Sequence, residues 1–212
     1  MRVKSIVATG FAVLTALLVG CAHSEKATPE PPEAAEQNPA VKKPAQTPTA
    51  SPAETEALTA FSKRVNDYLA LHNRLEGTLT NLPKEASPQA IDQHQRALHK
   101  LIAAERAAAK RGDIFGVEPE RIFRSHLARI FGGADGKQLK ASINDENPAG
   151  AIKLSVNGRY PDEVPLSTMP PQVLAVLPKL PEEIEYRFVG DHLILLDVHA
   201  HIIVDYIQNA LP

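Results

Sequence analysis

The 212-residue chain contains a single cysteine, Cys21, and no tryptophan. One cysteine leaves no partner for a disulfide within the chain. Aromatic residues make up only 5% of the sequence, and 25 acidic residues face 23 basic ones. A chain with no basic patch and no aromatic-rich stretch lacks the usual features of a nucleic-acid-binding surface. We therefore expect neither nucleic acid nor another polyanion among its partners.

The long apolar run that the sequence does contain lies near its start. Arg2 and Lys4 precede a mostly apolar stretch over 6–19, which is the pattern of a secretory signal and is shorter than a typical membrane span. The run ends in the letters LVGC at Cys21, which resemble a bacterial lipobox. That resemblance implies that 1–20 is removed as a signal peptide and that Cys21 is lipidated. The alternative is an ordinary signal peptide with an incidental cysteine.

A lipidated Cys21 makes the membrane a partner of the protein. Each buried acyl CH2 group contributes about 0.8 kcal/mol, so several acyl chains would anchor the chain stably. In Gram-negative bacteria an aspartate after the cysteine resembles a signal for retention in the inner membrane, and here Ala22 follows instead. For such a host we predict a protein at the periplasmic face of the outer membrane.

A proline-rich segment separates the predicted anchor from the rest. Residues 21–52 hold seven of the eighteen prolines and no aromatic residue, so this segment cannot bury enough apolar surface to offset the entropy lost on ordering. We predict a disordered spacer there. Residues 53–212 are enough for a single folded domain.

The first half of that domain has helical periodicity. Apolar residues at three- and four-residue steps predict a helix over about 52–79, and a second helix capped by Ser87, with Pro88 at its first position, that closes at Gly112. A short connection between them predicts an antiparallel hairpin. A third helix follows within 113–133.

Four histidines fall on these predicted helices, but their spacing argues against a metal site there. His94 and His99 are five residues apart, whereas metal-binding pairs on a helix favour a spacing of four. His72 continues the apolar stripe and is interpreted as a packed histidine. His126 lies on the third predicted helix.

The second half combines a short helix, a proline-rich strap and strands. A helix and turn are predicted within 137–150, and Asn157-Gly158 is a strong turn signal after alternating apolar residues. Residues 161–181 are too rich in proline for a central strand and are predicted to form a strap with a short helix capped by Ser167 or Thr168. The expected apolar anchors of the strap are Val173, Leu174, Leu177 and Leu180. Strands are predicted at 185–190, 192–198 and 201–207, as an antiparallel meander covered by helices on one face, which makes the domain α+β.

The most suggestive motif is Asp-x-His-x-His at Asp197, His199 and His201. It resembles the first-strand metal motif of amidohydrolases, in which both histidines share one face of a strand. That family's barrel takes roughly 250 residues, and only eleven residues follow His201. Ordinary strand lengths instead favour a turn at 199–200 that separates the two histidines.

Such a turn pairs Leu196 with Ile203 and Ile194 with Asp205. A metal site independent of the amidohydrolase fold stays open as an alternative. The weak candidate ligands for it are His192, Asp197, His199 and His201.

As a whole, the chain resembles an uncharacterised family of bacterial exported proteins. The resemblance rests on the segment GDIFGVEPE after the predicted hairpin and on the sequence from YPDEVPL to VDYI, and it covers roughly 57–212. It implies a fold unit and an exported location, and it carries no activity, cofactor or site residue.

These observations predict a lipid-anchored envelope protein that binds or scaffolds an envelope partner and is not an enzyme. No Gly-x-Ser-x-Gly nucleophile pattern is present, and the one cysteine is assigned to lipid. No cofactor is predicted. Two alternatives stay open: a periplasmic metal-binding protein or metal-dependent enzyme that uses the C-terminal histidines, and a ligand-binding sensor with the proline-rich strap as a lid.

Overall fold

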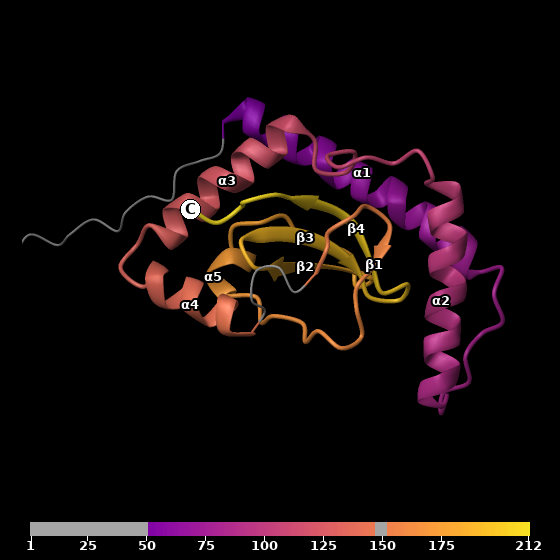
Figure 1. The fold of residues 1–212 in the computed structure, drawn as a ribbon. Helices are drawn as coiled ribbons and strands as arrows, with labels where there is room; N and C mark the ends of the chain where they lie inside the picture. The colour runs from indigo at the N-terminus through magenta and orange to yellow at the C-terminus, as the bar shows by residue number, and fades with distance from the viewer. Residues whose placement is uncertain (1–50, 147–151) are drawn as a thin grey trace, which may run out of the picture. The chain divides into compact units, whose positions relative to one another are not determined.

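The computed structural model describes residues 51–146 and 152–212, and their elements form an α+β fold (Figure 1). The helices are α1 (Pro52–Glu76), α2 (Pro88–Glu105), α3 (Val117–Phe131), α4 (Gly136–Glu146) and α5 (Pro171–Leu174). The strands are β1 (Gly158–Arg159), β2 (Ile184–Val189), β3 (His192–Asp197) and β4 (Ile202–Ile207). The predicted fold class is confirmed. The predicted signal peptide, Cys21 and nearly all of the predicted spacer lie outside the described residues.

Both long N-terminal helices begin at a serine followed by proline. The hydroxyls of Ser51 and Ser87 each accept a hydrogen bond from a backbone N–H three residues on, at 3.2 Å, and the following proline has no N–H to leave unpaired. The predicted start of the second helix is therefore confirmed. Within the described residues, no helix is both long enough and apolar enough to cross a membrane.

The helices do not pack in the order in which they follow one another. Helices α1 and α3 lie side by side over one face of the sheet, whereas α2 stands at a steep angle to α1 instead of running antiparallel along it (Figure 1). Helix α2 ends at Glu105, earlier than the predicted Gly112. Beyond that end, the backbone N–H groups of Gly112, Ile114 and Phe115 donate hydrogen bonds to the buried carboxylate of Asp205 and not to the carbonyls of a longer helix.

The sheet has four strands, one more than predicted. The strand order is β1-β4-β3-β2 and every pairing is antiparallel. The additional strand, β1, has only two residues and pairs with β4 directly after the Asn157-Gly158 turn. Such a short edge strand has too few residues to show an alternating pattern.

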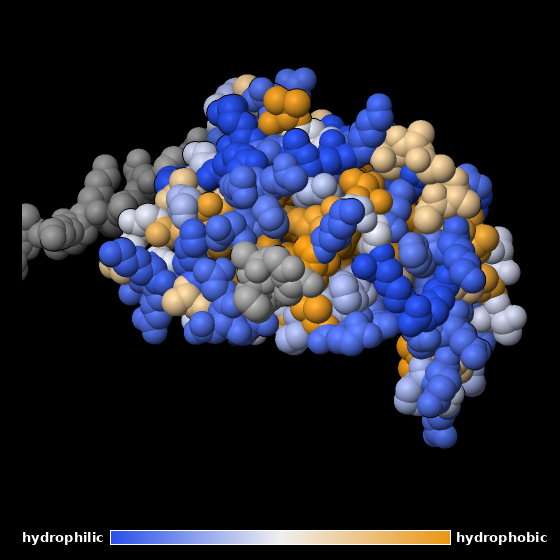
Figure 2. Space-filling view, viewed as in Figure 1, coloured by the Kyte–Doolittle hydropathy of each residue, from blue (hydrophilic) through white to orange (hydrophobic). Residues whose placement is uncertain are grey.

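Strand β3 is buried on both faces of the sheet. Leu193 and Leu195 join the main core beneath the helices, while Ile194 and Leu196 join a smaller cluster around Tyr160 on the other face. In the view of Figure 2, apolar residues reach the surface mainly near the middle of the face shown and are surrounded by hydrophilic ones. The core therefore has two layers of unequal size, and the helical layer is the larger.

The β3–β4 hairpin contains the tight turn that strand lengths predicted. The turn spans 198–201, and His201 adopts the left-handed conformation at φ 53°. The predicted pairing of Leu196 with Ile203 is confirmed. The predicted pairing of Ile194 with Asp205 is wrong, because a bulge between Leu195 and Leu196 moves the register by one residue.

The proline-rich strap runs beside the edge strand β2. The hydroxyl of Ser167 donates to the Phe188 carbonyl at 2.8 Å and accepts from its N–H at 3.2 Å, so Ser167 pairs with the sheet edge and does not cap α5. Val173 and Leu177 are buried anchors, as predicted. Leu174 is not an anchor, because half of it is exposed.

Candidate metal centre

Three side chains from two distant parts of the chain converge at one end of the sheet. His72 and Glu76 lie four residues apart in the last turns of α1, so they project from the same helix face. His199 comes from the β3–β4 turn. One ligand atom from each of the three lies within 4.8 Å of the others. We call these three residues the His72–Glu76–His199 cluster.

Asp197, the last residue of β3, forms hydrogen bonds to two residues of this cluster. Its carboxylate is fully buried and accepts hydrogen bonds from the Tyr68 hydroxyl and from His72 Nδ1, both at 2.6 Å. The backbone N–H groups of His199 and Ala200 donate to its other oxygen at 3.0 and 2.8 Å. One buried carboxylate therefore positions both the helical histidine and the turn that carries His199.

The buried ring of His72 has a carboxylate at each nitrogen. Nδ1 donates to Asp197, and Nε2 lies 3.2 Å from Glu76 Oε2. Burial lowers the pKa of His72, but the hydrogen bond and charge of Asp197, followed by those of Glu76, raise that pKa above its usual value. A cation at Nε2, either a proton or a metal ion, is favoured because two acceptors would otherwise face each other there.

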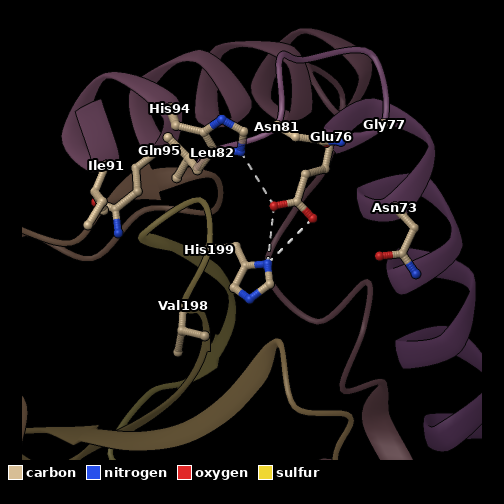
Figure 3. A pocket seen from close by; sticks show the side chains of 10 residues that line it. All are labelled: Asn73, Glu76, Gly77, Asn81, Leu82, Ile91, His94, Gln95, Val198 and His199. Carbon is tan, nitrogen blue, oxygen red and sulfur yellow. Dashed lines mark hydrogen bonds and ion pairs between the residues drawn. The ribbon is translucent and has the colours of Figure 1, made fainter. Parts of the chain in front are cut away.

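Glu76 stands between several imidazole rings. Its carboxylate oxygens lie 3.2 and 3.4 Å from His199 Nδ1, and Oε1 lies 3.5 Å from His94 Nε2 (Figure 3). Burial raises the pKa of Glu76, but the charges and hydrogen bonds of His199 and His72 lower that pKa below its usual value. Glu76 is therefore held ionised among three histidines.

Tyr68 and Arg106 complete the buried surroundings. Burial, and then the charge of Asp197, raise the pKa of the Tyr68 hydroxyl well above its usual value, so it remains a hydrogen-bond donor. The guanidinium of Arg106 lies 5.0 Å from the centre of the Tyr68 ring. The charge of Arg106 opposes this rise in the pKa of Tyr68.

The two distances to Glu76 are close to those between ligands of a tetrahedral metal ion. Zinc binds imidazole nitrogen and carboxylate oxygen at about 2.0–2.2 Å, so two of its ligand atoms lie about 3.3 Å apart. Glu76 Oε2 lies 3.2 Å from His72 Nε2 and 3.4 Å from His199 Nδ1. The bond from His72 Nδ1 to Asp197 is the carboxylate–histidine support that metal-binding histidines usually have.

A pocket of about 730 Å³ opens at this cluster. Figure 3 labels its ten lining residues, among which Glu76, His94 and His199 form one polar group. His72 is not among them and is fully buried. The cluster therefore has a buried side towards Asp197 and an open side towards the pocket.

The four ligands proposed from the sequence do not form one site. His192 and Asp197 occupy opposite ends of β3, about 16 Å apart at the usual rise per residue. His192 Nδ1 accepts a hydrogen bond from the Asn209 N–H at 2.9 Å. The His201 ring stacks on Tyr160, and its Nδ1 lies 3.0 Å from an oxygen of Asp162.

Two of the predicted ligands, Asp197 and His199, do lie at the cluster. Asp197 holds His72 and the turn by hydrogen bonds, and His199 offers a candidate metal-ligand atom. The partners that sequence reasoning missed are on the helices, where no metal site was expected. His72 is packed, as predicted, but Glu76 follows it by four residues. A histidine followed by an acid at that spacing was the available signal.

The other helical histidines have separate surroundings. His99 Nε2 lies 2.9 Å from the Asn157 carbonyl oxygen, and His126 Nε2 lies 3.2 Å from Glu54. Only His94 borders the cluster, from the neighbouring helix α2.

Comparison with protein-family models, curated proteins and solved structures found no match to this chain. The resemblance to exported bacterial proteins therefore remains a prediction from the sequence.

Proposed function

We propose that this protein binds a divalent transition-metal ion of the zinc class at the His72–Glu76–His199 cluster. The observation that carries the proposal is the convergence of one donor atom from each residue within 4.8 Å. Two imidazoles and one carboxylate form a ligand set common in zinc sites. We also propose, from the sequence alone, that the protein is exported and lipid-anchored at Cys21. Its function is then metal binding at the cell envelope.

The surroundings support this assignment more strongly than an isolated group of polar residues would. Asp197 holds His72 by Nδ1 and leaves Nε2 directed at the proposed ion. The same carboxylate binds the N–H of His199 and so positions the turn. One buried group therefore holds the His72 ring and the backbone that carries His199 before metal binds, which reduces the entropy lost on coordination.

The proposal predicts a difference between two histidines of the same turn. His199→Ala removes a ligand and should weaken zinc binding by more than about tenfold, because even residues that only support a ligand contribute that much. His201→Ala is the matched control, since His201 lies two residues away but contacts Asp162 and Tyr160. The measurement is isothermal titration of the chelator-treated full-length protein with zinc.

Equal zinc affinity in both variants would contradict the proposal, as would the absence of binding by the unaltered protein. Glu76→Gln provides a second test of the site. It keeps the side-chain size but removes the charge, and it should weaken zinc binding at least as much as His199→Ala. Circular dichroism of each variant shows whether the fold is retained.

A further inference from the structure

The proposed metal ion has protein ligands on one side only. His72 lies behind the ion, buried against Asp197, while Glu76 and His199 reach it from the edge of the pocket. Three protein ligands are the number found in zinc sites that keep a position for an external molecule, whereas structural sites use four. The remaining position then points into the pocket, which is large enough for a small molecule.

The pocket wall identifies the kind of molecule that fits. Leu82, Ile91 and Val198 give it apolar surface, and Leu82 and Ile91 are about two-fifths exposed. Amide side chains of Asn73, Asn81 and Gln95 add hydrogen-bond donors. Among the described residues, no lysine or arginine lines the pocket, so the proposed ion would supply its main attraction for an anion.

The local charge favours a single negative charge on that molecule. The divalent ion and its one carboxylate ligand, Glu76, leave a formal charge of plus one in the coordination sphere, because histidines bind a metal as neutral rings, and Asp197 contacts this sphere through His72. A monoanion neutralises this balance, whereas a cation would be repelled at close range.

We propose that the metal centre binds a small monoanion through oxygen donors, such as a carboxylate, whose apolar body rests on Leu82, Ile91 and Val198. This inference rests on the proposed metal-binding function. It assigns the fourth coordination position to an external ligand and makes His94 a neighbour that borders the anion. The competing arrangement, in which His94 moves in as the fourth ligand, closes the site.

Cobalt(II) in place of zinc makes both steps visible, because its visible absorption reports coordination. The full-length protein is loaded with cobalt and titrated with benzohydroxamate, acetohydroxamate and benzamidine. Benzohydroxamate should shift the cobalt spectrum and bind at least about fivefold more tightly than acetohydroxamate, since its ring buries apolar surface. Benzamidine, a cation of similar size, should leave the spectrum unchanged.

Two variants test the position of the anion without touching a metal ligand. Ile91→Glu places a negative charge in the pocket wall and should weaken benzohydroxamate binding by at least about fivefold. Leu174→Glu is the control, because Leu174 is also an exposed apolar residue but lines a different pocket. Cobalt should still bind to both variants, and at least as tightly to Ile91→Glu, because the added carboxylate attracts the cation.

The two proposals fail in different ways. Failure of cobalt to bind overturns the metal site itself. A cobalt spectrum that appears but does not respond to either hydroxamate overturns the open position and favours a site closed by His94. Equal affinity for the two hydroxamates, or a benzohydroxamate affinity that Ile91→Glu does not change, overturns the proposed contact of the anion with Leu82, Ile91 and Val198.

Discussion

Single residues determine which histidines of this protein meet and which do not. His199 and His201 are separated by one residue, yet the first faces Glu76 and the second faces Asp162. The left-handed conformation of His201 sends the chain away from the strand direction at this point. Asp197 fixes the other end of the turn by accepting two of its N–H groups.

His126 illustrates how one residue's surroundings select a protonation state. Its Nε2 lies 3.2 Å from Glu54, while its Nδ1 faces the guanidinium of Arg129. Burial first, and then the charge of Arg129, lower the pKa of His126 despite the opposing effect of Glu54. The neutral ring satisfies both neighbours, because Nε2–H donates to the carboxylate and Nδ1 accepts from the guanidinium.

This lowered pKa predicts how stability depends on pH. The unfolded state binds the proton of His126 more readily, so the contribution of this residue is complete above about pH 6.5 and declines as the pH falls below that value. The unfolding free energy of the unaltered protein should therefore fall more steeply than that of His126→Gln between pH 7.5 and 5. Urea denaturation across this range measures the difference. The prediction is contradicted if the stability advantage of the unaltered protein over His126→Gln grows as the pH falls. That result would mean that the charged ring, paired with Glu54, is the stabilised form.

At the scale of whole elements, the connection between α2 and α3 depends on a side chain from the sheet. Asp205 of β4 is fully buried. Its carboxylate accepts hydrogen bonds at 2.8–2.9 Å from the backbone N–H groups of Gly112, Ile114 and Phe115. The backbone N–H of Tyr206 also donates to it. Arg64 of α1 donates to the carbonyls of Ile114 and Phe115 from the other side. The loop is thus held between a strand and a helix.

We predict that Asp205→Asn strongly destabilises the fold. The amide NH2 would face backbone N–H donors, and each buried group left without a partner costs about 1–3 kcal/mol. A loss of at least about 2 kcal/mol in the free energy of unfolding is expected by chemical denaturation. Asp113→Asn is the control in the same loop. This exposed carboxylate accepts a hydrogen bond from the Lys110 N–H, and its replacement should cost less than about 1 kcal/mol. Equal losses in the two variants would contradict this account of the loop.

Most elements could be predicted from sequence, because apolar periodicity and capping residues act locally. The Ser87 cap and the β3–β4 turn are of this kind. The bulge at Leu195 and the early end of α2 depend on tertiary contacts that no local pattern records. The cluster was missed for the same reason, since Glu76 and His199 are 123 residues apart. Only the packing of α1 over the end of β3 brings them together.

At the scale of the folded domain, the proposed metal site lies where the helical layer meets the sheet. Helix α1 supplies two ligands, the β3–β4 turn supplies one, and α2 borders the pocket through His94. An ion at this place would connect segments that are otherwise joined by hydrogen bonds around Asp197. Metal binding would then both occupy the pocket and fix the position of the turn.

The central claim is tested most directly by locating the ion itself. Crystals of the full-length protein grown with zinc should give an anomalous difference peak at the zinc edge within about 2.0–2.2 Å of His72 Nε2, a Glu76 oxygen and His199 Nδ1. That peak should be absent from crystals of Glu76→Gln grown in the same way. A strong peak elsewhere, for example between His201 and Asp162, with none at the His72–Glu76–His199 cluster, would contradict the account.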